Sequence, residues 1–600
     1  MKLTRRDFLK LSAYTGIAVV SSGIQGCSSD DDEASDNPEA FRFDHGVASG
    51  DPWSDSVIIW TRVTPSDAGD VKVMWEVATD EAFTNLVNQD EASFGAHRDY
   101  TVKIEVQQLT AGTVYYYRFT AGTGANKLVS PVGMTKTLPT GSVNQVKMGV
   151  FSCSNYPAGY FNVYAEAAKR NDLDVVLHLG DYLYEYAREY DGSPAYASED
   201  AAALGREVMP EGEIIQLADY RTRYAQYRTD EDLQALHGKV PFIVVWDDHE
   251  IANDAYIDGA ENHDSTTEGD FETRKQAAVQ AFFEWLPLRP IRPDVEGRIY
   301  RQFEFGELVN LCMLDTRLIG RDKPLAYADY MNPNTGEMDV AEFTNDVSSD
   351  QRTILGAEQR NWLVQSLSQS GAIWQVLGQQ VLMTRMLLPA ITLTPDPLSP
   401  TLSLAEYGVI ATAALTYQAL LGQGVPDTDA ALKAAGMSDE QIAIIRDPVQ
   451  MGYLQSPKIP YNLDAWDGYA YDREVVLGAA LGAGKNLITL AGDTHNAWSG
   501  ALTNAQGSPV GIEFAVASVS SPGLEDYLQI PDAATARQQE AAFPALVDDL
   551  NYTNLRERGY MVVTFTPSNA EAEWVFIDTV KSKNYQVEAS LSHKISVFST

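Results

Sequence analysis

The chain contains 600 residues, of which 83 are Asp or Glu and 44 are Lys or Arg, so its formal net charge is −39. A surface this acidic repels nucleic acids and anionic membranes, which argues against a polyanion as the partner. The length exceeds that of one small domain and predicts more than one folded unit.

The first 27 residues have the pattern of an export signal and are set apart from the fold. Arg5 and Arg6 precede Asp7-Phe8-Leu9-Lys10, and an apolar stretch follows from about residue 11 to residue 24. This pattern resembles a twin-arginine signal, which implies the twin-arginine export machinery as a partner. The alternative is an ordinary secretory signal that contains a chance arginine pair.

The end of this segment is a candidate lipid-attachment site. Ile24-Gln25-Gly26-Cys27 resembles a lipoprotein processing site with Cys27 as the acylated residue, although Gln25 departs from the small residue that is usual there. Residues 28–40 are acidic and Ser-rich and predict a disordered linker. We therefore expect an exported protein that is periplasmic, extracellular or on the cell surface, with membrane contact only through such an anchor.

Residues 41–138 are predicted to form a β-sandwich. Short runs of β-branched and aromatic residues alternate with turn residues, and the predicted strands cover residues 56–63, 71–77, 100–106 and 114–121. The turn at residues 109–115 resembles the one before a late strand of fibronectin type III domains. Trp60 and Trp75 are the expected core residues.

Residues 142–585 are predicted to form a layered α/β domain, because apolar strands alternate there with helical patterns. The predicted strands cover residues 147–151, 175–179, 242–246 and 487–490, and the predicted helices cover 276–285 and 358–367, with the end of another at 165–170. Residues 387–460 are predicted to be an insertion with helical stretches at 404–421 and 430–435. A lid, an oligomer contact and a surface elaboration all remain open for it.

Chemically active side chains follow four of these strands. They are Cys153, Asp181 with Tyr184, Asp247-Asp248-His249, and Asp493 with His495. Ligands bind beyond the carboxyl ends of strands in open α/β sheets, so these groups are expected to meet in one site. Their types suit a centre with more than one metal ion.

Each group is weak evidence by itself, and the order of the groups is the stronger signal. A Gly-Asp pair after a strand is commonly structural, and a single cysteine is commonly a buried thiol. The run Asp247-Asp248-His249-Glu250 is the strongest piece, because three adjacent carboxylates would repel one another without a cation. Cys312 lies in an apolar run and is predicted to be buried, and two mature cysteines do not make a disulfide scaffold.

The ordered set resembles the calcineurin-like metallophosphoesterase superfamily, and within it the alkaline phosphatase D family. The blocks are Ser152-Cys153-Ser154, Gly180-Asp181 with Tyr184, Asp247-Asp248-His249-Glu250 and Gly492-Asp493-Thr494-His495. Further similar segments are residues 45–63, 314–317, 355–363, 466–469 and 513–523, whereas residues 387–460 lie outside the pattern. The resemblance implies an N-terminal fibronectin III-like β-sandwich followed by a four-layer αββα metallophosphoesterase domain.

The resemblance also implies the metals, one Fe³⁺ and one or two Ca²⁺. Cys153, Tyr184 and His495 would complete the iron side, Asp248 and Asp493 the calcium side, and Asp181 would bridge the two. Asp248 and Asp493 stand where the superfamily has neutral ligands, and hard anionic oxygens favour Ca²⁺ or Mg²⁺ over Zn²⁺. Asn253 is a weaker candidate for a second calcium or for the phosphate.

The expected activity is hydrolysis of phosphodiesters, and in addition of phosphomonoesters, by a hydroxide that bridges the metal ions. His249 is predicted to protonate the leaving alkoxide, with a structural-ligand role as its alternative. Arg317 and Arg221 are candidate phosphate-binding residues, or partners of nearby carboxylates. The alternatives are a phospholipase D-like hydrolase of phospholipids and a non-catalytic calcium-binding surface protein.

Overall fold

The computed structural model describes residues 40–599 except 123–126, 290–297, 333–337, 393–401, 403 and 529. The predicted export signal, Cys27 and all but the last residue of the acidic linker therefore lie outside the described residues. Among the described residues, no helix is long and apolar enough to cross a membrane.

The N-terminal part contains one separate sheet and three strands that belong to a larger sheet. The sheet has the order β10-β8-β5-β6, with β9 beside β8. Its strands are β5 (Val71–Ala78), β6 (Leu86–Phe94), β8 (Val114–Ala121), β9 (Leu128–Val129) and β10 (Gly133–Lys136). The three further strands are β2 (Val47–Gly50), β3 (Val57–Arg62) and β7 (Thr101–Val106). The four predicted strands of this region are thus confirmed.

Trp60, one of the two predicted core tryptophans, does not face the core of the N-terminal part. Trp75 packs between these strands with Val73 and Ile59. Trp60 belongs to the core of the larger α/β part, where its ring lies 6.0 Å from that of Trp285 and its indole donates to the backbone oxygen of Glu284. Successive side chains of a strand point to opposite faces, so Ile59 and Trp60 cannot fill the same core. The prediction for Trp60 was wrong because both faces of β3 are covered.

The strands β2, β3 and β7 extend the first large sheet of the α/β part. That sheet has the order β27-β26-β25-β11-β12-β15-β2-β3-β7. The join is the parallel pair of Gly50 with Phe242, and a Cβ on Gly50 would lie 2.5 Å from the backbone oxygen of Phe242. Beside it, Arg301 donates to both Asp51 (2.6 Å) and the backbone oxygen of Val244 (2.9 Å). The N-terminal part is therefore fastened to the strand that leads into Asp247.

The remaining strands of this sheet come from both ends of the α/β part. They are β11 (Val146–Phe151), β12 (Val175–His178), β15 (Phe242–Val244), β25 (Arg558–Phe565), β26 (Asn569–Ile577) and β27 (His593–Phe598). The strand β27 lies beyond residue 585, where the predicted domain ends, and pairs with β26.

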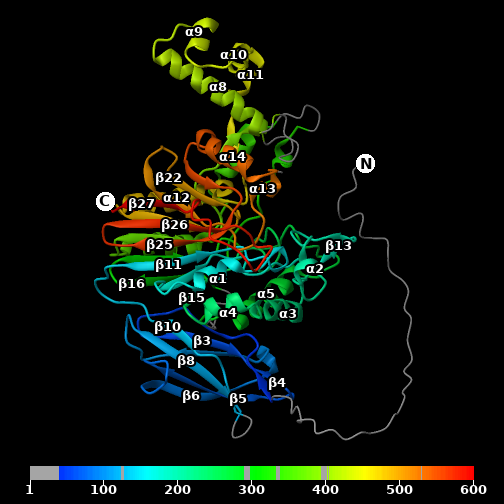
Figure 1. The fold of residues 1–600 in the computed structure, drawn as a ribbon, viewed down its shortest axis with the longest axis vertical. Helices are drawn as coiled ribbons and strands as arrows, with labels where there is room; N and C mark the ends of the chain where they lie inside the picture. The colour runs from blue at the N-terminus through cyan, green and yellow to red at the C-terminus, as the bar shows by residue number, and fades with distance from the viewer. Residues whose placement is uncertain are drawn as a thin grey trace, which may run out of the picture.

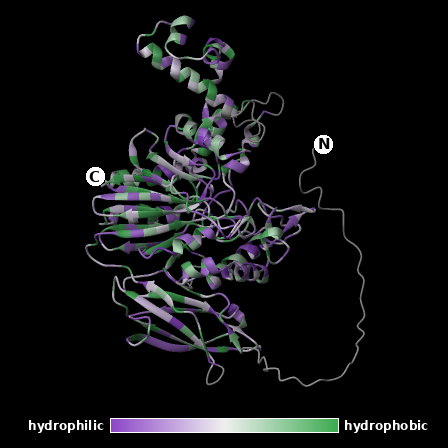
Figure 2. Cartoon of the chain, in the orientation of Figure 1, coloured by the Kyte–Doolittle hydropathy of each residue, from purple (hydrophilic) through white to green (hydrophobic). Residues whose placement is uncertain are grey.

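A second sheet has the order β16-β17-β18-β21-β23-β22-β24. Its strands are β16 (Arg301–Phe305), β17 (Val309–Met313), β18 (Trp374–Gly378), β21 (Asn486–Ala491), β22 (Ala497–Thr503), β23 (Pro509–Ala515) and β24 (Leu550–Asn554). Val150 of the first sheet and Ile488 of the second belong to one buried core. Figure 2 shows that apolar residues concentrate along the strands of this central body. The four strands predicted in the α/β part are confirmed.

Two groups of helices pack against the strands of these sheets. One comprises α1 (Asn162–Ala168), α3 (Leu217–Arg228), α4 (Glu231–His237) and α5 (Phe271–Trp285). The other comprises α6 (Val340–Val347), α7 (Gly356–Gln369) and α12 (Ala470–Gly482). The helix α5 begins at Asp270, whose carboxylate caps the backbone N–H of Thr273. The predicted helices at 276–285 and 358–367 are confirmed within α5 and α7.

Short elements complete the body. They are β1 (Phe41–Arg42), β4 (Thr64–Pro65), β13 (Glu189–Tyr190), β14 (Ser193–Pro194), α2 (Ala201–Leu204), α13 (Leu524–Tyr527) and α14 (Ala533–Leu546). In the part of the chain that the structure describes, 3₁₀ turns lie at Ala96–Arg98, Tyr156–Ala158, Tyr327–Tyr330, Ala390–Thr392 and Trp466–Tyr469.

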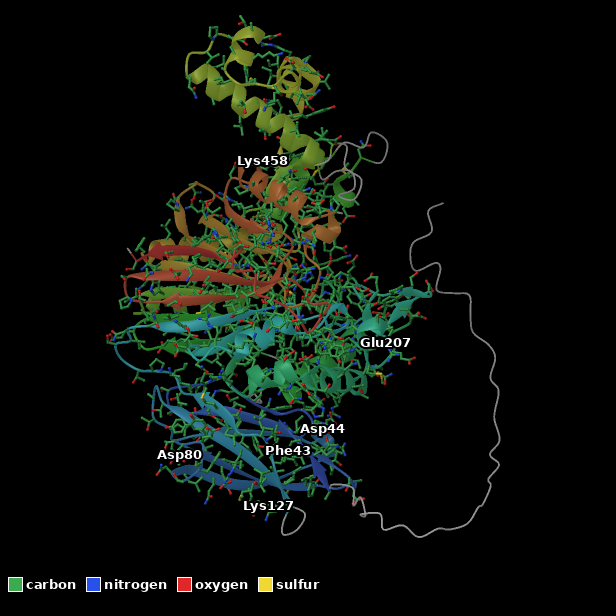
Figure 3. All side chains as sticks on the ribbon, viewed as in Figure 1. Phe43, Asp44, Asp80, Lys127, Glu207 and Lys458 are labelled. Atoms are coloured by element: carbon green, nitrogen blue, oxygen red, sulfur yellow. The ribbon has the colours of Figure 1, made fainter. Side chains whose placement is uncertain are left out.

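The segment predicted to be an insertion forms an arm that stands away from the body (Figure 1). Its two ends pair as β19 (Leu387–Pro389) and β20 (Lys458–Pro460), and Lys458 marks its base in Figure 3. The helices between them are α8 (Leu404–Gly422), α9 (Asp429–Ala434), α10 (Asp439–Arg446) and α11 (Pro448–Tyr453). Ile410, Leu432 and Ile442 belong to a separate small core there. The arm is thus a packed helical unit.

Candidate metal centre

The four predicted strand ends meet in one place. Cys153, Asp181 and His495 offer ligand atoms within 4.8 Å of one another, and so do two further groups. These groups are Asp181, Asp248 and His249, and Asp247, Asp248 and Asp493. Asp181 belongs to two groups and Asp248 to two groups, so the three overlap. The overlap is what a centre with adjacent cations requires.

The backbone at these strand ends is strained. Cys153, Asp181, Asp493 and His495 all have positive φ, between 53° and 65°. Side chains other than glycine rarely adopt this conformation, and it persists where the surroundings impose it, most often at functional sites. The neighbouring glycines permit close packing of the turns. A Cβ on Gly180 would lie 2.5 Å from the backbone nitrogen of Asp247.

Several buried oxygens at the centre have no hydrogen-bond partner. They are Oδ1 of Asp181, Oδ2 of Asp247 and Oδ1 of Asp248. An unpaired buried carboxylate oxygen is costly, and a bound cation removes that cost. Burial raises the pKa of Asp181 and of Asp493 well above the usual range, and the charges of neighbouring carboxylates add to the rise. The donor set therefore fits positively charged ions.

The side of the centre nearest Cys153 combines a thiol, a phenol and an imidazole. The hydroxyl of Tyr184 donates to Oδ2 of Asp181 (3.1 Å) and lies 3.1 Å from Nε2 of His495. Nδ1 of His495 lies 2.7 Å from the backbone oxygen of Pro522, which can only accept, so this nitrogen carries the proton. The lone pair of Nε2 then faces Tyr184 and Asp181, as a metal ligand requires.

The protonation states on this side suit a metal. Burial raises the pKa of the Cys153 thiol well above its usual value, and the charge of Asp181 adds to the effect. A bound cation reverses this preference and stabilises the thiolate. Burial lowers the pKa of His495 to about 3, so its imidazole is neutral near neutral pH.

His249 is oriented by Glu185, a residue that the sequence analysis did not single out. Oε2 of Glu185 lies 2.7 Å from Nδ1 of His249, and its Oε1 accepts from the backbone N–H of Asn253 (2.9 Å). Burial opposes protonation of His249, but the carboxylates of Glu185, Asp248 and Asp181 outweigh it and hold its pKa well above the usual value. The sequence offered one signal for Glu185, which is that it directly follows the predicted ligand Tyr184.

The structure corrects the argument from three adjacent carboxylates. Only part of the run Asp247-Asp248-His249-Glu250 faces the centre. Glu250 accepts backbone N–H groups of Asp181 (3.0 Å) and Asp247 (2.7 Å), and also that of Tyr182. It therefore ties the turns after β12 and β15 together.

Arg317 lies at the centre as a partner of its carboxylates. It is 0% exposed and donates to Asp247 (2.5 Å), Asp464 (2.6 Å) and Asp493 (3.1 Å). Its donors are thus engaged by anions of the chain, which supports the alternative of a carboxylate partner over phosphate binding. Asp464 is a further acidic residue of the centre that the sequence analysis missed.

Two other predicted residues are not brought to the three ligand groups. Arg221 donates to both oxygens of Glu284 at 2.7 Å and to the backbone oxygen of His97, which supports the alternative of a carboxylate partner over phosphate binding. The amide oxygen of Asn253 accepts from Tyr186 (3.2 Å) and its nitrogen donates to Glu261 (3.0 Å). Asn253 therefore lies in the layer around Glu185.

Of the two cysteines in the described part of the chain, only Cys312 lies away from the centre. Cys153 and Cys312 are both buried free thiols, and Cys312 is an apolar core residue as predicted. A cavity of about 910 Å³ lies between the N-terminal part and α5, with Lys103, Trp246 and Phe283 in its wall. It contains no residue of the three ligand groups.

Comparison with known proteins agrees with the site. The sequence model of the PhoD-like phosphatase family matches residues 148–574, and that of the PhoD-like phosphatase N-terminal domain matches residues 26–139. The mixed α/β fold, the candidate metal centre and these matches define a phosphoesterase. The chain belongs to the PhoD-like phosphatase family.

Two relatives cover most of the chain. Alkaline phosphatase D of Bacillus subtilis (strain 168) is 30% identical over 589 residues, which is 95% of this chain and 84% of the relative. A solved structure of PhoD superposes with a TM-score of 0.68 at 29% identity and covers 92% of this chain and 90% of that one. The mixed α/β fold with several sheets is therefore that of PhoD, and small phosphoesters are the substrate class that the family implies.

Proposed function

We propose that the protein is an exported, metal-dependent phosphoesterase that hydrolyses phosphodiesters in preference to monoesters. The observation that carries the proposal is the set of buried oxygens of Asp181, Asp247 and Asp248 that lack a hydrogen-bond partner and lie inside overlapping ligand groups. Family membership supports the reaction, and the donor set supports the metals.

The proposed metals are one Fe³⁺ and one or two Ca²⁺. A thiolate, a phenolate and an imidazole from Cys153, Tyr184 and His495 favour a strongly acidic trivalent ion. Asp248 and Asp493 offer hard oxygens, which favour Ca²⁺ over Zn²⁺. Asp181 belongs to ligand groups on both sides and is the proposed bridge.

The chain supplies the proton for the leaving group. When bound, the cations neutralise phosphate oxygens and lower the pKa of the attacking water. His249 keeps Nδ1 bonded to Glu185, which leaves Nε2 as its second nitrogen for the leaving oxygen. The ion pair with Glu185, which is not among the proposed ligands, favours the protonated imidazole. Ring contact with Tyr184, whose centroid is 4.2 Å away, limits movement of the imidazole.

The preference for diesters follows from charge. Arg317 and His249 are the cations that counter the burial of Asp248, and Arg317 is already bonded to three carboxylates. A monoester dianion brings one more negative charge than a diester into this acidic surrounding. The lower cost of binding the diester supports it as the better substrate.

The finer description of the fold is part of the proposal. We propose that residues 41–138 are a fibronectin III-like sandwich and that the remainder has a four-layer αββα order. The strand pairing and the two groups of helices support it. An experimental structure in which both helix groups lie against one sheet would overturn the layer order.

We also propose export by the twin-arginine route, with Cys27 as a candidate acylation site. The sequence of residues 1–27 supports it. Replacing Arg5 and Arg6 together by Lys should abolish export of the full chain, as measured by cell fractionation. Unchanged export of the double variant would contradict the route, and a lipid-free mature N-terminus would exclude the anchor.

Hydrolysis of a chromogenic bis-ester and of the matching monoester tests the activity. Protein loaded with iron and calcium should cleave bis(p-nitrophenyl) phosphate with the higher kcat/KM, and a chelator should abolish this activity. No turnover of either ester by the loaded protein would favour the non-catalytic calcium-binding alternative. Cleavage of phospholipid head groups with no turnover of soluble diesters would favour the phospholipase D-like alternative.

A further inference from the structure

A series of tyrosines leads from the metal centre to the surface. Tyr184 is 1% exposed, Tyr186 and Tyr196 are half-buried, and Tyr527 at the end of α13 is 59% exposed. The ring centroids of Tyr184 and Tyr196 are 6.1 Å apart, and those of Tyr186 and Tyr196 are 5.7 Å apart. The rings of Tyr184, Tyr186 and Tyr196 therefore form a continuous aromatic wall beside the centre.

Tyr527 stands at the outer end of this wall beside the ligands. Its hydroxyl interacts with that of Tyr196, whose own hydroxyl lies 3.2 Å from Nδ1 of His495. Tyr527 ends the short helix α13 that follows Pro522, whose backbone oxygen accepts from Nδ1 of His495. Its hydroxyl thus faces inward, while most of its surface is open to solvent.

Tyr461 lies on a different segment and approaches the same place. It is within electrostatic range of both Tyr527 and Asp493, and it is half-buried. Tyrosines from the loops after β12 and β14, from α13 and from residue 461 therefore surround the approach to the centre. An exposed aromatic ring leaves apolar surface in contact with water, which is unfavourable. A planar group that stacks on the ring would bury this surface.

The chemistry of this wall selects one kind of ester group. Phenol rings are neutral and add no repulsion to a site that already carries many carboxylates. They stack on planar groups with little dependence on the exact identity of the ring. A phosphodiester has a second ester group that remains on phosphorus after the leaving group departs, and this group must lie beside the metal centre.

We propose that Tyr527, supported by Tyr196, forms a subsite that stacks on a planar second ester group, such as an aryl or nucleoside group, of a phosphodiester. The subsite rests on the proposed phosphodiesterase function and names its substrate class. Tyr527 is a specificity-determining residue, since it contacts the part of the substrate that does not react.

Two diesters with the same leaving group test the subsite. Bis(p-nitrophenyl) phosphate carries a planar second group, whereas methyl p-nitrophenyl phosphate does not. Tyr527→Ala should raise KM for the first about tenfold, with kcat within about twofold, and should leave KM for the second within about twofold. Tyr527→Phe keeps the ring and should restore the KM for the planar diester.

The neighbouring Leu528, which is 37% exposed, provides the matched control. Leu528→Ala should leave both diesters unchanged. Equal effects of Tyr527→Ala on the two diesters, or no effect on either, would show an ordinary surface tyrosine and overturn the subsite.

Binding of an inert diester mimic separates the subsite from the proposed function. By calorimetry, phenyl phenylphosphonate should bind about tenfold more weakly to the metal-loaded Tyr527→Ala protein than to the unaltered protein. Binding that depends on Tyr527 in a protein that cleaves neither diester would support the subsite and overturn the proposed function. Turnover of the diesters with no dependence on Tyr527 would support the proposed function and overturn the subsite.

Discussion

The two sides of the metal centre differ in how their buried ligands are held and neutralised. On one side, Cys153, Tyr184 and His495 are groups that burial keeps neutral, and they are held by hydroxyl and backbone contacts. On the other side, Asp247 and Asp493 are bonded to Arg317, which is itself fully buried. The first side thus requires a cation to deprotonate its ligands, whereas the second side is partly neutralised by the chain.

This difference shows why Arg317 belongs to the architecture of the centre. Burial lowers the pKa of an arginine, yet the carboxylates of Asp247, Asp248 and Asp464 raise that of Arg317 well above its usual value. A guanidinium in this position fixes the acidic side in one arrangement before any metal binds. The side of Cys153 has no such group among its described contacts and should therefore depend more on its metal.

Loss of the shared ligand should have the largest effect. Asp181→Asn changes a residue that belongs to ligand groups on both sides, so we expect kcat/KM for a diester to fall by about a thousandfold or more. Both metals should be depleted in elemental analysis. Asp200→Asn, at an exposed helix start, is the control. Normal content of both metals in Asp181→Asn would contradict the shared role.

Variants of the two sides should separate the metals. Cys153→Ser should lose iron and keep calcium, and Asp493→Asn should lose calcium and keep iron. Each should lower kcat/KM by about a hundredfold or more. Circular dichroism checks that the fold is retained. Loss of the same metal in both variants would show that the comparison between the sides is wrong.

Removal of the partner of His249 should have a smaller effect with a defined sign. Glu185 raises the pKa of His249, so Glu185→Gln should lower it, and the imidazolium should be lost at a lower pH. The alkaline limb of the pH–kcat profile should therefore move to lower pH, and kcat should fall by about tenfold to a hundredfold. The loss should be greater for alkoxide leaving groups than for p-nitrophenolate.

The exposed Glu189 gives a matched control for this variant. Glu189→Gln should leave the profile unchanged. An alkaline limb that stays in place in Glu185→Gln would exclude His249 as the proton donor.

Removal of the arm should have the smallest effect on activity. It has its own core and joins the body through β19, β20 and contacts of α8 with α14. Replacing residues 390–457 by a short turn should leave kcat/KM for a soluble diester within about twofold. A large loss confined to kcat/KM, with unchanged metal content, would instead identify the arm as part of the substrate site.

The sequence was sufficient for the parts of the site that depend on local order. Apolar runs that end in Cys153, Asp181, Asp247 and Asp493 predict strands, and the carboxyl ends of three of them meet because β11, β12 and β15 are parallel neighbours. Asp493 follows β21 of the second sheet, and the sequence did not predict that the site lies between two sheets. The sequence did not predict which way individual side chains point. Glu250 and Asp248 are two residues apart, yet both carboxylate oxygens of Glu250 accept backbone N–H groups, whereas only one oxygen of Asp248 does and its Oδ1 has no hydrogen-bond partner.

Contacts between distant segments explain what could not be predicted. Arg317 meets Asp464 across 147 positions, and the choice between a phosphate and a carboxylate partner depends on that contact. In the same way, β2 joins the sheet of the α/β part through Gly50 and Phe242, which covers the second face of β3 and turns Trp60 toward Trp285. Neither contact leaves a periodic signal in the chain.

The central claim is that the two sides hold different metals. Anomalous diffraction from crystals of the exported protein, measured on both sides of the iron absorption edge, tests it most directly. The account predicts an iron peak among Sγ of Cys153, the Tyr184 oxygen and Nε2 of His495, and a separate peak without iron signal beside Asp248 and Asp493. Iron at both positions, or zinc in place of both, would contradict it.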